Sequence, residues 1–90
     1  MVTMEQRITT RLMEALDPIL LDVVDESDRH AGHAGAREGG ETHYRVRIVS
    51  ARFERQSRVE RHRLVYGLLN AEFAAGLHAL ALIAKAPVEP

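Results

Sequence analysis

The strongest constraint on the fold is the alternation in residues 43–49, HYRVRIV. One parity carries the apolar residues Tyr44, Val46 and Ile48. The other parity carries His43, Arg45 and Arg47. Since neighbouring side chains of a strand point to opposite faces, the pattern predicts a strand with one buried face and one basic face. Such a strand belongs to a sheet that other elements cover on one side.

Two segments have the spacing of amphipathic helices that could cover the sheet. Residues 3–17 begin with a capping box, and Pro18 ends the segment. Its stripe has intervals of four: Ile8, Leu12 and Leu16. Residues 57–75 begin with a second capping box, and Gly76 is placed to end one continuous helix there. The predicted apolar stripe of this second helix consists of Val59, His62, Tyr66, Leu69 and Phe73, and Val65 and Leu68 widen it.

Two short apolar runs complete the predicted sheet. Residues 19–25 are expected to pair with residues 43–49 as an antiparallel hairpin, although the loop between them, residues 26–42, is long. Residues 77–86 are apolar at both parities, which predicts a strand buried on both faces or covered by helices. A helix-containing connection joins this strand to residues 43–49, and its length suits a right-handed parallel crossover.

The predicted topology brings histidines together. Parallel neighbouring strands begin at the same end of a sheet, so His43 and His78 are expected at one edge. The loop 26–42 runs into the same edge and carries His30 and His33. Neutral imidazole is a common ligand of zinc, copper and iron. The alternative is that the loop histidines and His43 are simply exposed, and that His62 is a hydrogen-bonded residue at the edge of the core.

The chain contains no cysteine, which excludes disulfides and thiolate ligands supplied by this chain alone. An iron–sulfur cluster here would need sulfur ligands from another molecule. Its net charge is only −1, but seven arginines fall between positions 45 and 63. Arginine suits bidentate contact with phosphate, and the alternative is a solvated basic face.

Motifs of other classes are missing from the sequence. We find no P-loop, no GxGxxG after a strand and no defensible Ser-His-Asp spacing, so we do not expect an enzyme. No apolar stretch resembles a signal peptide or approaches the roughly 20 residues of a membrane span. We therefore expect a cytoplasmic protein without membrane contact.

Four blocks together resemble the BolA family: VVDES, ETHYRVRIVSARF, RVERHRLVYGLL and GLHALALIAKAP. The resemblance runs from about Leu12 to Pro87. It implies an α/β (α+β) fold of the class II KH-like type, with the order αββααβ and helices packed on one face of a three-stranded mixed sheet. One further short helix would fall in residues 51–56. The whole chain 1–90 would be one domain, with tails at 1–3 and 88–90. Many relatives have glycine where Arg55 stands.

The resemblance also implies a function. Family members pair with monothiol glutaredoxins as heterodimers and share a bridged [2Fe–2S] cluster, in iron–sulfur or iron homeostasis. The partner and glutathione supply sulfur, so the isolated chain should hold no cluster. The family's ligands would be His78 and one loop histidine, for which His30, His33 and His43 compete.

The alternative implied by the resemblance is a DNA-binding transcriptional regulator of morphology and stress genes. It would contact promoter DNA through the basic helix 57–75 and the turn before it. The residues concerned are Arg52, Arg55, Arg58, Arg61, His62 and Arg63. A third possibility is an interaction module with neither metal nor DNA.

Overall fold

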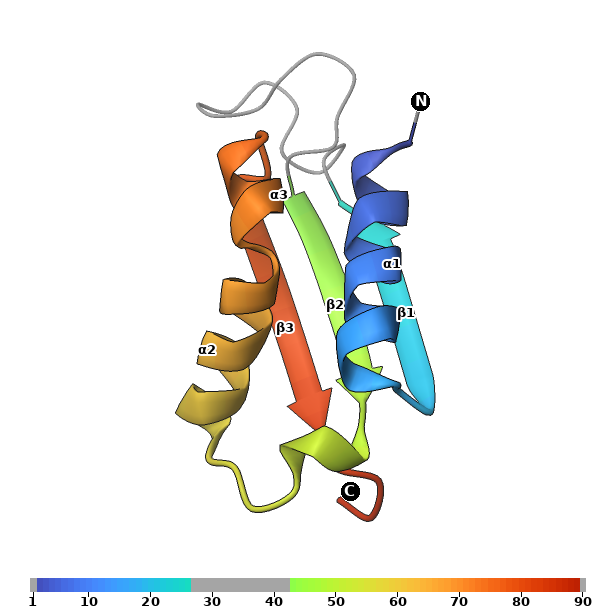
Figure 1. Ribbon diagram of the computed structural model, residues 1–90, viewed down its shortest axis with the longest axis vertical. Helices are drawn as coiled ribbons and strands as arrows, with labels where there is room; N and C mark the ends of the chain where they lie inside the picture. Colours follow the sequence, from blue (N-terminus) through green and yellow to red (C-terminus); the bar gives the residue numbers. More distant parts are fainter. Residues whose placement is uncertain (1, 27–42, 90) are drawn as a thin grey trace.

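The computed structural model describes residues 2–26 and 43–89. Their elements follow the order α1 (Met4–Leu16), β1 (Leu20–Asp25), β2 (His43–Val49), the 3₁₀ helix η2 (Ala51–Phe53), α2 (Arg58–Leu68), α3 (Asn70–Ala74) and β3 (Ala79–Lys85) (Figure 1). The short helix expected in residues 51–56 is η2. The predicted order is confirmed, but the expected continuous second helix is wrong, because it is divided at Leu69 into α2 and α3.

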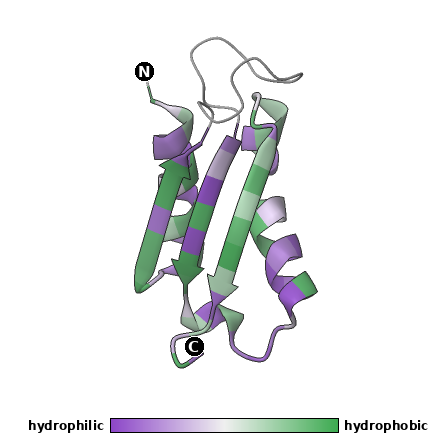
Figure 2. Cartoon of the chain, turned by 180° about the vertical axis from the view of Figure 1, so that it is seen from behind, coloured by the Kyte–Doolittle hydropathy of each residue, from purple (hydrophilic) through white to green (hydrophobic). Residues whose placement is uncertain are grey.

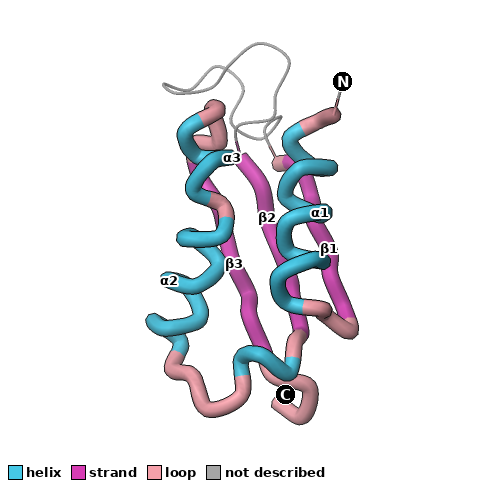
Figure 3. Tube along the Cα trace, viewed as in Figure 1, coloured by secondary structure: helices cyan, strands magenta, loops and turns pink. Residues whose placement is uncertain are grey.

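The three strands form one mixed sheet in the order β1-β2-β3. β1 pairs antiparallel with β2, and β2 pairs parallel with β3, as predicted. The helices α1, α2 and α3 lie on one face of this sheet (Figure 3). Seen from behind, the strands lie in front of the helices, and no described residue covers this second face (Figure 2). The fold is therefore two layers with one open sheet face.

The core lies between the sheet and the helices. The apolar parity of β2 is buried as predicted, and the basic parity, Arg45 and Arg47, is exposed. The core residues that the elements contribute include Ile8, Leu12, Leu16, Tyr44, Val46, Ile48, Phe53, Val65, Leu69, Leu77, Leu80 and Leu82. The α1 stripe is thus confirmed, and both predicted capping boxes are formed.

The stripe expected on the second helix is wrong in part. Val59 and Tyr66 are exposed, whereas Val65 and Leu69 are buried as the stripe predicted. The Tyr66 hydroxyl donates a hydrogen bond to the Leu80 carbonyl at 2.7 Å, so its side chain reaches β3. The second helix therefore buries part of the predicted stripe, including Val65 and Leu69, and leaves Val59 and Tyr66 outside the core.

The expectation that the last strand is buried on both faces is wrong, whereas the alternative, a strand covered by helices, is confirmed for one face. Leu80 and Leu82 are buried beneath the helices, but Ile83 is 45% exposed on the open face. An apolar run at both parities therefore occurs here in a strand with only one covered face. Among the described residues, no helix is both long and apolar enough to cross a membrane.

Candidate functional site

His43 and His78 lie together at the end of the sheet where β2 and β3 begin. His43 is the first residue of β2 and is opposite Ala79, the residue after His78. Their ring centroids are 5.2 Å apart, and the ring planes are inclined by 56°. The predicted proximity of these two histidines is confirmed. His78 is exposed and His43 is half-buried, so the pair is open to a partner.

The central strand positions His43. β2 is paired on both sides, and the His43 carbonyl accepts a hydrogen bond from the Glu26 N–H at 2.8 Å. Glu26 also forms an ion pair with Arg45 at 2.8 Å. The backbone at His43 is therefore held by both neighbouring strands and by Glu26, which Arg45 in turn holds in place.

A tight turn positions His78. Gly76 has φ 129°, in a region that side-chain-bearing residues rarely adopt. The N–H of Leu77 then donates to the carbonyl of Glu72 at 3.0 Å, and the Leu77 side chain is buried in the core. Because Leu77 is anchored at both backbone and side chain, the next residue, His78, is directed out of the core at a defined place.

The separation of the two rings fits binding to one metal ion. Two imidazoles on one tetrahedral ion, with metal–nitrogen bonds of about 2.0–2.1 Å, have ring centroids about 5 Å apart. The described residues contain no group of three or more potential His, Cys, Asp or Glu ligands. This part of the chain thus offers two nitrogen donors, and further ligands would have to be added. His30 and His33, the other ligand candidates, lie outside the described residues.

The candidate nucleic-acid residues lie toward the other end of the sheet, on η2, on the turn after it and on the first half of α2 (Figure 1). Four of these arginines are exposed: Arg52, Arg55, Arg58 and Arg63. Arg55 has φ 67°, a left-handed conformation that favours glycine. The turn therefore places a non-glycine residue in a backbone conformation that glycine adopts more readily.

Arg61 has a different environment from the other arginines. Its side chain is only 11% exposed. Its Nε donates to the Gln56 carbonyl and its Nη1 to the Ala84 carbonyl, each at 3.1 Å, and Nη1 also pairs with Glu89 at 2.7 Å. These contacts connect α2, β3 and the C-terminal turn. The guanidinium is thus engaged within the molecule.

His62 is half-buried and lies parallel to the Tyr66 ring, with 6.4 Å between the ring centroids. It belongs to the basic end of the molecule and not to the His43 and His78 pair.

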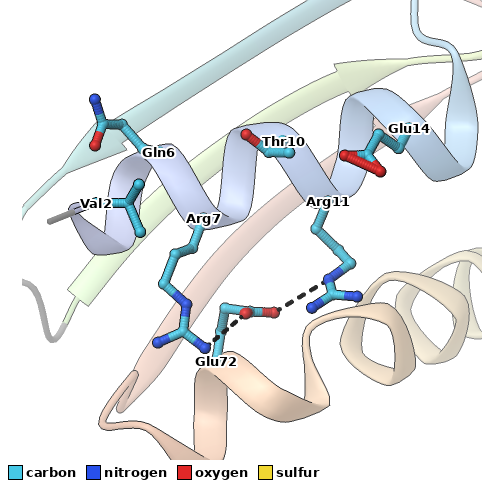
Figure 4. A pocket seen from close by; sticks show the side chains of 7 residues that line it. All are labelled: Val2, Gln6, Arg7, Thr10, Arg11, Glu14 and Glu72. Carbon is cyan, nitrogen blue, oxygen red and sulfur yellow. Dashed lines mark hydrogen bonds and ion pairs between the residues drawn. The ribbon is translucent and has the colours of Figure 1, made fainter.

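An ionic contact between α1 and α3 escaped prediction. Glu72, whose side chain is 1% exposed, pairs with Arg7 at 3.0 Å and with Arg11 at 3.7 Å (Figure 4). These residues line a hollow of about 340 Å³ beside α1. The spacing of the two arginines, one helical turn apart, was a possible signal. No pattern in the sequence indicated that Glu72 would be their partner, because it lies far along the chain.

Comparison with known families identifies the fold. The family described as BolA-like protein matches residues 12–89. The chain belongs to this family. The BolA domain of SufE1 from Arabidopsis thaliana has a TM-score of 0.89 and 47% identity, covering 100% of this chain and 99% of that one.

Two curated relatives differ in how much of their length the chain matches. SufE-like protein 1, chloroplastic/mitochondrial, from Arabidopsis thaliana is 51% identical over 92% of this chain, which spans only 24% of that protein. An uncharacterised protein in the cobS 5′ region of Sinorhizobium sp is 48% identical over 99% of this chain and 97% of its own length. The BolA-like domain therefore occurs in relatives of about its own length and as a part of much longer ones.

Proposed function

We propose that this protein pairs with a monothiol glutaredoxin and shares a bridged [2Fe–2S] cluster with it and with glutathione. The observation that carries the proposal is the pair of neighbouring imidazoles, His43 and His78, in a chain without cysteine. Clusters with two histidines on one iron are an established type. Membership of the BolA-like family supports the same role in iron–sulfur or iron homeostasis.

In this proposal the chain contributes nitrogen and the partner contributes sulfur. His43 and His78 would hold one iron in their neutral form, and the partner's cysteine and glutathione would supply thiolates. Histidine ligation in place of thiolate raises the reduction potential of such a cluster. The exposed position of His78 leaves room for the partner to approach.

Reconstitution with defined components tests this proposal. The chain is mixed with a monothiol glutaredoxin, glutathione, iron and sulfide, and the product is followed by size, visible circular dichroism and pulsed EPR of the reduced cluster. We expect a heterodimer with nitrogen couplings that His78→Ala and His43→Ala each diminish. His62→Ala is the matched control, because it removes an imidazole from α2, at the end of the molecule away from His43 and His78. Spectra unchanged by His78→Ala would refute its role as a ligand.

DNA binding is the second candidate function, favoured by the four exposed arginines at the η2 and α2 end. Phosphate contacts release counterions, so binding to labelled duplex DNA should weaken steeply with salt. We expect Arg58→Gln with Arg63→Gln to reduce the slope of log K against log salt by about 2. Arg47→Gln, an exposed arginine on the open sheet face, is the control. An unchanged slope in the double variant would exclude these residues as phosphate contacts.

Two further expectations accompany these proposals. We propose that the protein acts by binding and transfer and not as an enzyme. We keep the cytoplasm as the predicted location, although SufE-like protein 1 is named as chloroplastic/mitochondrial.

A further inference from the structure

Glu72 is a fully buried carboxylate that connects two helices. Its Oε2 accepts a hydrogen bond from Arg7 Nη2 at 3.0 Å, and its Oε1 lies 3.7 Å from Arg11 Nε. Oε1 has no hydrogen bond of its own. The two arginines remain partly exposed, at 34% and 49% of their side chains. A buried carboxylate whose cationic partners are removed is strongly unfavourable, so these contacts determine where α3 lies against α1.

The short helix α3 is held by this contact with α1 and by the ring contact of Phe73 with Tyr66 of α2, whose centroids are 5.3 Å apart. It comprises only residues Asn70–Ala74, and no side chain among the described residues caps its start. Glu72 is its buried residue, while Phe73 is only partly buried. A five-residue helix has little intrinsic stability. The ionic contact with α1 is therefore the buried polar contact of α3, beside the packing of Phe73 against Tyr66 and the core.

The same residue is connected to the metal-binding candidate through its backbone. The Glu72 carbonyl accepts hydrogen bonds from Ala75 at 3.1 Å and from Leu77 at 3.0 Å. Leu77 directly precedes His78. Glu72 is thus bonded to the turn on one side of His78, while the pairing of Ala79 opposite His43 holds the other side.

We propose that Glu72, held by Arg7 and Arg11, is a positioning residue that sets His78 at the distance from His43 that a shared metal ion requires. The inference deepens the proposed function, because it takes this histidine pair as the metal-binding part of the chain. Glu72 itself binds no metal in this scheme. It acts by keeping α3, and with it the start of β3, in place against α1.

Copper provides a test that needs no glutaredoxin. In a chain carrying His30→Ala and His33→Ala, Cu²⁺ is titrated and its nitrogen ligands are counted by pulsed EPR. We expect two imidazole nitrogens from His43 and His78. Glu72→Gln, which keeps the shape but removes the charge, should weaken Cu²⁺ binding about 10-fold and shift the signal toward one nitrogen. Arg7→Gln should act in the same direction and serves if Glu72→Gln does not fold.

Glu89→Gln is the matched control, because it is the same substitution at an arginine-paired carboxylate far from α3. All variants are titrated at a temperature where each is folded, as checked by its unfolding curve. The inference would be overturned if Glu72→Gln and Arg7→Gln both bound Cu²⁺ through two nitrogens with an affinity within twofold of the chain that carries only His30→Ala and His33→Ala. Binding of Cu²⁺ through only one imidazole nitrogen in that reference chain, with Glu72 intact, would overturn it as well. If the copper results are as expected but no cluster forms with glutaredoxin, the inference holds and the proposed function fails.

Discussion

Replacing Arg61 should destabilise the protein far more than replacing its exposed neighbour Arg58. In Arg61→Ala, the carbonyls of Gln56 and Ala84 lose their charged donor, and Glu89 loses its cationic partner while it keeps the hydrogen bond from the Ala86 N–H. The guanidinium carbon also lies 5.9 Å from the centre of the Phe53 ring, and this contact disappears. The change therefore removes contacts among α2, β3, the turn before α2 and the C-terminal turn at once.

The size of the effect follows from the individual contacts. Hydrogen bonds from a charged group contribute about 1.5–3 kcal/mol each, but water can replace part of this where the site opens. The pair with the 40% exposed Glu89 adds about 0–1 kcal/mol, and the ring contact about 0.5–1 kcal/mol. Allowing for rehydration, we expect a loss of about 2–4 kcal/mol. For a domain of this size, that lowers the melting temperature by about 8–30 °C.

Urea denaturation followed by circular dichroism measures this difference. Arg58→Ala is the control, since an exposed arginine in the same helix should change the free energy of unfolding by less than about 0.5 kcal/mol. Arg61→Lys should lie between the two, because lysine keeps the charge but lacks the planar fork that reaches two carbonyls. An Arg61→Ala protein as stable as Arg58→Ala would refute the reasoning. With the expected result, weaker DNA binding by Arg61→Ala would report lost structure and not a lost phosphate contact.

Three further changes have defined outcomes. Arg55→Gly should raise the free energy of unfolding in urea by up to about 1 kcal/mol, because glycine adopts φ 67° without strain, although it also increases the entropy of the unfolded chain. A decrease would contradict this. Tyr66→Phe should lower it by about 1 kcal/mol through loss of the bond to Leu80, and an unchanged midpoint would argue against that bond. The hydrogen bond from the Ser57 N–H holds the pKa of Glu60 below its ordinary value of 4.5, so this carboxylate stabilises the fold above pH 4.5 and the contribution is lost as the pH falls further. In denaturation series below pH 4.5, the free energy of unfolding of Glu60→Gln should therefore fall less steeply with pH than that of the unsubstituted protein. The same dependence on pH in both proteins would contradict the lowered pKa of Glu60.

Local patterns in the sequence were sufficient to predict the sheet and its topology. The parity of β2, the capping boxes at Thr3 and Ser57, and the length of the crossover each depend on neighbouring residues or on simple chain geometry. The meeting of His43 and His78 followed from the parallel pairing alone. This part of the candidate site could be predicted because it is a property of strand order and not of side-chain packing.

The predictions that were wrong concern burial, which depends on the elements that pack against each residue in the folded protein. Ile83 is apolar but faces the side of the sheet that no described element covers. Val59 is apolar but exposed, whereas the charged Arg61 is almost buried, because its donors satisfy carbonyls that α2 and β3 bring together. Hydrophobic periodicity cannot indicate a polar side chain that is buried by its hydrogen bonds. The role of Glu72 was missed for the same reason.

The positions of the two candidate sites make each a control for the other. The histidine pair lies where β2 and β3 begin, and the exposed arginines lie toward the opposite end of a molecule whose longest dimension is 39 Å (Figure 1). At physiological salt the screening length is about 8 Å, so removing an exposed arginine should have little electrostatic effect on the histidines. A loss of cluster ligation in the Arg58 and Arg63 double variant, or a loss of salt-dependent DNA binding in His78→Ala, would therefore indicate a change in the fold. Only a variant that impairs one activity and leaves the other intact assigns a function to its own end of the molecule.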